Sequence, residues 1–407
     1  GSSFQRKFWK SNSSCMMFRS AARRRLIPAA GITAALLVGN SRTRKECRAP
    51  QRPVHCAALP SWVPGLGRRE PEVGLLTLGL NPSRQTIINL KALDLGQVNR
   101  AAAAHPGVGG KGQNAAKAAA TFLAGRPDAG VTVAQFLGGH TGVAISRHLD
   151  DLKISQITQS TSAATRQTMT LLDYPVDGKP QPTVTELVMP SEELSRAEVD
   201  RLLASVLRKC SKQKGILLMG TWPKGVTSDF YAAVARGKGK ECLVLMDAFK
   251  PIDEVSKILS EGFVDIYKVN AFELCTLMGA TGIKEGQVTA AEVVDAVKRA
   301  FEKFPGVKYF AITDGASGAY FFSRDGEALR LEIPKVKCLN PIGAGDTVAG
   351  VMMATFCAGI APCLSEAMRL GLAAASAKVQ SEAEGGVFEV SEAYRMRDLI
   401  SVTSLSK

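Results

Sequence analysis

NPIGAGDT at residues 340–347 joins an apolar run typical of a strand, Leu329–Ile333, to a helical stretch of small residues. Gly343 and Gly345 let the backbone turn tightly, so that its N–H groups converge on one point. The N-terminus of the following helix adds about half a positive charge at that point. The backbone of Gly343, Ala344 and Gly345 is therefore predicted to form an anion-binding turn.

Asp346 lies at the mouth of this turn, where an ionised carboxylate can accept a proton from an attacking hydroxyl group. The neighbouring backbone N–H groups would stabilise the charge that develops on a phosphoryl group during transfer. The segment therefore indicates phosphoryl transfer with Asp346 as the base. It also fits an ordinary glycine turn in which Asp346 caps the helix.

A second glycine-rich segment, GGKGQN at residues 109–114, begins an Ala-rich stretch with helical periodicity. With Gly107 it matches the G-x-G-x-x-G string of dinucleotide-binding folds, which needs a strand directly before it and an acidic residue about 20 positions later. Residues 101–106 make a poor strand, and the residues around Thr132 are not acidic. A P-loop is excluded as well, because the residue after Lys111 is neither Ser nor Thr.

The same glycines, Gly110 among them, would let a polyhydroxylated ligand approach the backbone closely. Lys111 and Asn114 could then hydrogen-bond to its hydroxyl groups. A glycine turn that merely starts a helix would give the same pattern, so both interpretations stay open.

Asn270 and Glu273 follow a strand-like run that ends at Lys268, and their spacing puts both on one face of a helix. At the carboxyl end of a strand they could hold Mg²⁺, directly or through water. The same spacing is that of a capping box, which needs no metal. Thr313 and Gly315 begin another glycine turn after a strand, which could approach a nucleotide or simply form a hairpin.

From Val73 onward, short apolar runs alternate with amphipathic helical patterns, which predicts a mostly parallel sheet covered by helices on both faces. Two stretches, 86–103 and 165–189, are instead β-rich with polar alternation. They predict a small second sheet acting as a lid, with segments near 85–105 and 160–190. We expect one α/β domain over residues 71–407.

The charge of the chain is concentrated at its beginning. Of the formal net charge of +14, residues 1–70 carry 14 of the 51 Lys and Arg and two of the 37 Asp and Glu, which leaves the remainder near neutral. A near-neutral body argues against nucleic-acid binding. Residues 26–38 form an apolar run too short to span a bilayer, and an acid-poor, Arg-rich stretch follows it.

Residues 1–70 therefore predict a targeting leader, disordered or cleaved, with no stable membrane span in the body. The apolar run and the Arg-rich stretch that follows it favour a plastid over a mitochondrion as the destination of the protein. A mitochondrial or secretory signal and a plain basic tail, which would leave the protein in the cytoplasm, stay open. The nine cysteines have no metal-site spacing, and we expect reduced, mostly buried thiols.

Together and in this order, these segments resemble the PfkB family of carbohydrate kinases, over residues 73–400. GGKGQN resembles the first family signature, residues 340–346 resemble the second, D-T-x-G-A-G-D, and Asn270 to Glu273 resembles its N-x-x-E. The resemblance implies a ribokinase-like three-layer α/β/α core with a β lid that often pairs in a homodimer. It also implies ATP and Mg²⁺ as cofactors.

Finer features resemble the 1-phosphofructokinase and tagatose-6-phosphate kinase branch. They are LNP at 80–82, GQVNR at 96–100, FLGGHTG at 136–142, TR at 165–166, TEL at 185–187 and GTWPKG at 220–225. By this likeness the sugar or its phosphate would face Lys111, Asn114 and Arg166. The nucleotide and Mg²⁺ would lie beside Lys268, Asn270, Glu273, Thr313 and Gly315.

The chain departs from this branch at positions that bind the sugar. After Asn-Pro the branch usually has an Asp that clamps sugar hydroxyls, and Gln85 stands there in this chain. In the second signature, Asn340 replaces the first acid and Pro341 replaces the Thr. The resemblance therefore supports the transfer chemistry more firmly than it identifies the substrate.

Three functions follow. The first is ATP-dependent phosphorylation of a sugar or sugar phosphate, for which Lys111 and Arg166 favour a phosphorylated hexose because cations pair with phosphate. The second is a ribokinase- or fructokinase-like kinase of an unphosphorylated sugar. The third is a catalytically weak interaction protein of an organellar complex, which the presence of Asp346 and the glycines disfavours.

Overall fold

The computed structural model describes residues 72–174 and 182–405. The predicted leader, 1–70, lies outside the described residues, as does part of the second lid segment, 175–181. Among the helices that the structure describes, none combines the length and the apolar character needed to cross a bilayer. The six cysteines of this part are free and four of them are buried, as the sequence predicted.

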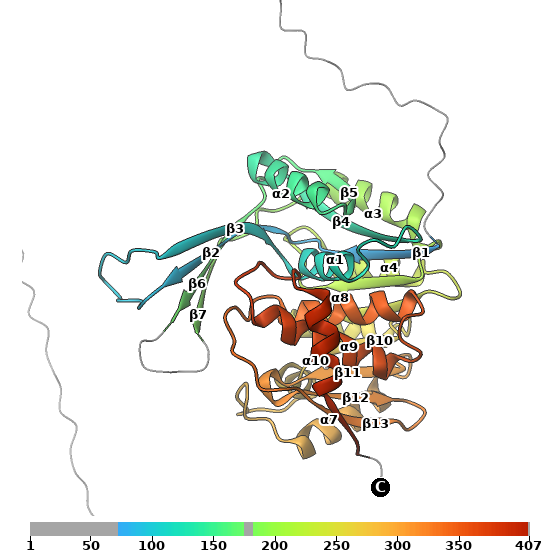
Figure 1. Ribbon diagram of the computed structural model, residues 1–407. Helices are drawn as coiled ribbons and strands as arrows, with labels where there is room; N and C mark the ends of the chain where they lie inside the picture. The colour runs from blue at the N-terminus through green and yellow to red at the C-terminus, as the bar shows by residue number, and fades with distance from the viewer. Residues whose placement is uncertain (1–71, 175–181, 406–407) are drawn as a thin grey trace, which may run out of the picture. The chain divides into compact units, whose positions relative to one another are not determined.

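A large sheet forms the centre of the fold, in the order β14-β13-β12-β11-β10-β9-β8-β1-β4-β5 (Figure 1). The strands from β5 to β11 in this order pair in parallel, and β12, β13 and β14 extend the sheet with antiparallel pairs. These strands are β1 (Val73–Leu78), β4 (Ala129–Leu137), β5 (Ser155–Ser160), β8 (Gly215–Met219), β9 (Leu243–Asp247), β10 (Ile266–Asn270), β11 (Tyr309–Thr313), β12 (Ala319–Ser323), β13 (Ala328–Glu332) and β14 (Ser401–Ser404). The mostly parallel sheet confirms the predicted α/β class.

Helices cover both faces of this sheet, because its central strands are apolar on both sides. All six residues of β1 are buried, and Leu75 belongs to one hydrophobic core while Leu76 and Leu78 belong to the other. One core packs against α1 (Lys111–Phe122), α2 (Gly139–Asp151), α8 (Ala344–Cys357), α9 (Leu364–Val379) and α10 (Val390–Leu399). The other packs against α3 (Arg196–Cys210), α4 (Ser228–Arg236), α5 (Ile252–Ser260), α6 (Ala271–Leu277) and α7 (Ala290–Lys303). The predicted three layers are confirmed.

A second, four-stranded sheet projects from one side of this body (Figure 1). Its order is β3-β2-β6-β7, with β2 and β6 parallel and the outer pairs antiparallel. The strands are β2 (Ser83–Leu90), β3 (Ala103–Gly109), β6 (Gln167–Asp173) and β7 (Thr183–Val188). We call it the lid sheet.

The judgement that residues 101–106 make a poor strand was wrong for residues 103–106, which belong to β3. Pro106 is tolerated because β3 is an edge strand, which leaves one side of its backbone unpaired. The dinucleotide-binding interpretation stays excluded, since β3 pairs antiparallel in the lid sheet and not in parallel within the central sheet.

Candidate active site

The turn before α8 has the backbone geometry that the sequence predicted. Gly343 caps the helix with a φ of 74°, a left-handed conformation that favours glycine. The N–H of Ala344 donates to Pro341 O at 3.2 Å. The N–H groups of Gly343 and Gly345, in contrast, have no hydrogen-bond partner among the described residues. These two groups, with the helix N-terminus, are the ones able to bind an anion.

Asn340 shapes this turn although it replaces the acid of the signature. Its Oδ1 accepts from the N–H of Ile342 at 3.0 Å, and its Nδ2 donates to Ala383 O at 2.9 Å. A carboxylate could make the first bond but not the second, because it has no hydrogen to donate. The amide is therefore compatible with an ordered turn.

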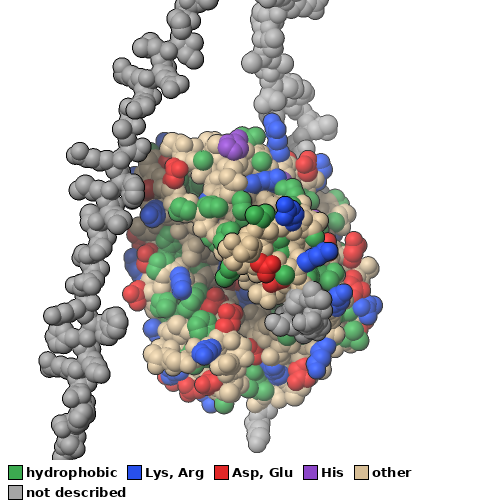
Figure 2. All heavy atoms as spheres, turned by 90° about the vertical axis from the view of Figure 1, so that its left-hand side faces the viewer, with side chains coloured by type: hydrophobic (Ala, Val, Ile, Leu, Met, Phe, Trp, Pro, Cys, Tyr) green, Lys and Arg blue, Asp and Glu red, His purple; other side chains and the backbone are tan. Residues whose placement is uncertain are grey.

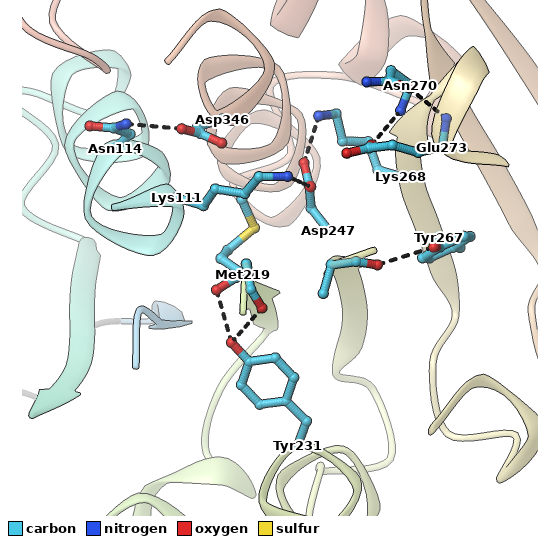
Figure 3. Close-up of polar contacts among 12 residues, drawn as sticks. Lys111, Asn114, Met219, Tyr231, Asp247, Tyr267, Lys268, Asn270, Glu273 and Asp346 are labelled. Atoms are coloured by element: carbon cyan, nitrogen blue, oxygen red, sulfur yellow. Dashed lines mark hydrogen bonds and ion pairs between the residues drawn. The ribbon is translucent and has the colours of Figure 1, made fainter. Parts of the chain in front are cut away.

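Asp346 lies in the first turn of α8 and is buried, with 8% of its surface exposed. Its interpretation as a helix cap was wrong, because Gly343 occupies the cap position and no side chain caps this helix. The Nδ2 of Asn114 donates to Asp346 Oδ2 at 2.9 Å (Figure 3). Burial raises the pKa of Asp346 above its ordinary value, against the opposing effects of Lys111, the Asn114 hydrogen bond and Lys268.

Two lysines share one buried carboxylate next to this aspartate. Lys111 Nζ contacts Asp247 Oδ1 at 2.7 Å, and Lys268 Nζ contacts Asp247 Oδ2 at 2.6 Å (Figure 3). Burial alone would raise the pKa of Asp247, but the two ammonium groups outweigh it and hold that pKa below its ordinary value. Burial alone would lower the pKa of Lys111, but the nearby carboxylates Asp247, Asp346 and Glu273 together outweigh it and raise that pKa, so that Lys111 stays charged.

Asp247 was missed by the sequence analysis. Its only sequence signal is an acidic residue at the end of an otherwise apolar strand, LVLMD, which is common wherever a strand leaves a core. The pairing with Lys111 joins residues 136 positions apart, which no local pattern reveals.

A cavity of 430 Å³ lies at the carboxyl ends of the parallel strands, where open α/β sheets bind ligands. Its lining includes Asn81, Lys111, Arg166, Asn270 and Glu273. Asp346 does not line this cavity. Helix α1 connects the cavity to Asp346, because residues 111 and 112 of α1 line the cavity and residue 114 binds the Asp346 carboxylate. Two of the predicted sugar-side residues, Lys111 and Arg166, thus share one cavity with the predicted metal-side pair, and the predicted base lies beside it.

Asn270 and Glu273 form the capping box that the sequence left open. Asn270 Oδ1 accepts from the Glu273 N–H at 2.7 Å, and Glu273 Oε2 accepts from the Asn270 N–H at 3.0 Å. A direct Mg²⁺ bond to Asn270 Oδ1 would compete with this cap. Because Glu273 also lines the cavity and Mg²⁺ usually keeps several waters, the pair fits a hydrated Mg²⁺ better than a directly bound one.

Arg166, Gln85, Thr313 and Gly315 differ in their relation to the cavity. Arg166 lines it and donates to the carbonyls of Asn81 at 3.0 Å and Pro82 at 3.4 Å. Gln85 does not line it; it is buried in β2, where its Nε2 donates to Thr170 Oγ1 at 3.0 Å. Thr313 pairs with Asn270 in the sheet, but neither Thr313 nor Gly315 lines the cavity.

Comparison with known proteins agrees with this architecture. Residues 84–387 match the pfkB family of carbohydrate kinases. The fold is similar to phosphofructokinase-2 of Escherichia coli with substrates and products, at 22% identity over 80% of this chain and 98% of that chain, with a TM-score of 0.68. It is also similar to a Thermotoga maritima protein described as a possible 1-phosphofructokinase, at 18% identity over 82% of this chain and 100% of that chain, with a TM-score of 0.68.

Ribokinase from Giardia lamblia has the same fold, at 18% identity over 79% of this chain and 99% of that chain, with a TM-score of 0.63. These identities show the fold alone, whereas the family match covers most of the chain. Members of this family generally use ATP with Mg²⁺. The chain belongs to the pfkB family of carbohydrate kinases and is a phosphotransferase that acts on a sugar hydroxyl.

Proposed function

We propose that this enzyme transfers the γ-phosphoryl group of ATP to a hydroxyl of a phosphorylated hexose, as a 1-phosphofructokinase or tagatose-6-phosphate kinase does. Asp346 is the base. The observation that carries the proposal is the position of its carboxylate. It is buried at the start of α8 and held by Asn114 next to backbone N–H groups that have no partner in the described part of the chain.

The proton of the substrate hydroxyl would pass to Asp346. Asn114 occupies Oδ2, which leaves Oδ1 as the accepting oxygen. Burial favours this step, because a carboxylate with a raised pKa is a stronger base than an exposed one. The N–H groups of Gly343 and Gly345 would receive the charge of the transferring phosphoryl group.

Residues of β10 and α6 support the proposed binding of ATP and Mg²⁺. Lys268, held by Asp247, lies close to Gly345: a Cβ added there would be 3.2 Å from Lys268 Nζ. Glu273 and Asn270 would hold Mg²⁺ through water, and the ion would supply positive charge to the phosphates of ATP. Thr313 and Gly315, at the end of the neighbouring strand, are assigned to the nucleotide by family likeness only.

Arg166 supports a phosphorylated substrate. Among the described residues its guanidinium bonds only to backbone carbonyls, so its charge remains available to a phosphate in the cavity. A ribokinase- or fructokinase-like kinase of an unphosphorylated sugar is the second candidate. The Lys111–Asp247 ion pair favours this second candidate, because Asp247 already binds Lys111, one of the two cations assigned to the sugar phosphate.

The test is a substrate panel: purified protein with ATP, Mg²⁺, hexose phosphates and the matching free sugars. Turnover on a hexose phosphate and not on its free sugar is the expected result. The reverse preference would establish the second candidate. Nucleotide binding without turnover on any sugar, together with co-purification with a large assembly, would establish the catalytically weak interaction protein.

We further propose that the lid sheet joins two copies of the chain. β7 is an edge strand, and Val184, Leu187 and Val188 are exposed on it. Figure 2 faces the side from which the lid sheet projects and shows hydrophobic side chains lying among charged ones. Light scattering after chromatography should give a dimer, and Leu187→Lys should shift it toward monomer; a monomeric wild type would contradict the pairing.

An organellar destination, plastid before mitochondrion, remains our proposal for residues 1–70. It rests on their basic, acid-poor composition. A fluorescent protein carrying these residues should enter an organelle in cells, and a diffuse cytoplasmic signal would contradict the proposal.

A further inference from the structure

The edge strand of the lid sheet is attached to the body by two charged side chains. Val108, near the end of β3, donates its N–H to Glu384 Oε2 at 2.9 Å. Its carbonyl oxygen accepts from Lys117 Nζ at 2.6 Å. An edge strand leaves such backbone groups unpaired, so the carboxylate and the ammonium here take the place of a neighbouring strand.

The two side chains are also bound to each other. Lys117 Nζ and Glu384 Oε2 are 2.7 Å apart, and the Lys117 side chain is fully buried. Glu384 Oε1 makes a further contact with His148 Nε2 of α2. Burial would raise the pKa of Glu384, but His148 and Lys117 hold it at about 2, so Glu384 is ionised at neutral pH.

Burying such a pair is a costly way to stabilise a fold, because the desolvation of both ions can exceed their mutual attraction. A pair of apolar residues would fill the same volume at least as well. The location suggests what the charges do instead: they fix the backbone of Val108, three positions before Lys111, to the helix that carries Asn114.

The loop that carries Glu384 also supports the anion-binding turn. A Cβ added at Gly385 would lie 2.7 Å from the Asn114 amide, and one added at Gly343 would lie 2.8 Å from Gly385 Cα. Gly385 therefore packs between Asn114 and the turn that begins α8. Through Glu384 this short loop contacts the lid sheet, α1 and α2, and through Gly385 it contacts that turn.

We propose that Glu384 and Lys117 are positioning residues, which hold the lid strand β3 on α1 so that Lys111 and Asn114 keep their places beside the sugar. This inference rests on the proposed function only in taking those two residues to face the substrate. Losing the pair should weaken sugar binding, while the ATP side, built on β10 and α6, should be little affected.

The principal variant is the double replacement Lys117→Met and Glu384→Met, which removes both charges at similar volume. Because the N–H and carbonyl of Val108 lose their partners, the thermal midpoint should fall slightly. We expect the KM for the sugar to rise about tenfold or more, with the KM for ATP within about twofold, because displacements of about 1 Å are costly in active sites. Exchange of backbone amides in residues 103–109 should accelerate. The matched control is Lys214→Met with Glu241→Met, an exposed ion pair with the Nζ and Oε2 atoms 2.8 Å apart. This variant should change neither the KM for the sugar nor the amide exchange of residues 103–109.

A purely structural role predicts a lower thermal midpoint with an unchanged sugar KM, and that result would overturn the proposal. If the double variant does not fold, Glu384→Asp replaces it. The aspartate side chain is one methylene shorter, so it should lose the hydrogen bond from the Val108 N–H and raise the KM for the sugar. An unchanged KM would again overturn the proposal. If the wild type phosphorylates no sugar, the proposed function fails, and the exchange of residues 103–109 still tests whether Glu384 and Lys117 hold β3 on α1. Unchanged exchange in either variant then overturns it.

Discussion

Asn114 and Asp346 are 232 residues apart in the sequence and 2.9 Å apart in space, with the amide Nδ2 of the first donating to the carboxylate Oδ2 of the second. The bond joins the first glycine-rich segment to the second. It orients the carboxylate, leaves one oxygen for a substrate proton and opposes the effect of burial on the pKa of Asp346.

The acidic limb of the pH–rate profile should reflect Asp346. A base must be deprotonated, so kcat should fall as the pH falls through its pKa. Because burial raises that pKa, the fall should begin above the ordinary aspartate value of about 3.9. In Lys111→Met, which removes a charge that lowers the pKa of Asp346, the limb should move to higher pH. A kcat at saturating substrates that stays constant to about pH 4 would contradict the prediction.

Asp247→Asn should destabilise the protein at neutral pH by about 3 kcal/mol or more, because it leaves Lys268 buried without its carboxylate. The pKa of Asp247 is lowered on folding, so its contribution is present above the pKa of the unfolded state and is lost as the pH falls through the folded value. The free energies of unfolding of the wild type and of Asp247→Asn, measured with denaturant, should therefore converge at acidic pH. Asp229→Asn, in an exposed pair with Lys257, should cost less than about 1 kcal/mol. Equal losses of stability in Asp247→Asn and Asp229→Asn would contradict the role of Asp247 as the partner of a buried lysine.

Gly385→Ala should impair catalysis through Asn114. The new Cβ would lie 2.7 Å from Asn114 Cγ and Oδ1, so the amide that holds Asp346 must move. A fall in kcat of about 10- to 100-fold is expected, since small displacements in an active site are costly. Gly237→Ala, where the Cβ would first meet the end of the Leu207 side chain at 3.1 Å, serves as the control. Normal turnover in Gly385→Ala would show that Asn114 need not keep its position.

Arg166→Gln should separate phosphorylated from free sugars. Hydrogen bonds to charged groups contribute about 1.5–3 kcal/mol, so the KM for a sugar phosphate should rise about 10- to 100-fold. Slow turnover of the free sugar, where detectable, should be unchanged. Arg208→Gln, on the exposed surface of α3, should leave both values as in the wild type. An equal rise for both sugars would assign Arg166 to packing.

The elements that the sequence predicted best are those whose signal is local. β9 and β11 are short apolar runs, and α3 is an amphipathic helix that begins with a Ser-x-x-Glu cap, so the signal for each lies in consecutive residues. β5, with the sequence SQITQS, has no apolar pattern, and only its pairing with β4 makes it a strand. α10 was missed as well, since it buries only Ala393 and Met396.

The candidate site divides in the same way. Lys111 and Asp346 could be proposed from the sequence because each lies in a glycine-rich segment whose signal consists of consecutive residues. Asp247 and Glu384 were not found, because each acquires its role from partners more than 100 positions away. Gln85 was assigned to the sugar by likeness alone, and the cavity lining does not include it.

The kinetics of Asp346→Asn on the preferred sugar substrate test the central claim most directly. Asparagine keeps an acceptor for Asn114 but cannot take the proton, so kcat should fall by about 10²- to 10⁴-fold. The KM for ATP and the fold should be retained. A folded Asp346→Asn enzyme that turns over as fast as the wild type would contradict the account.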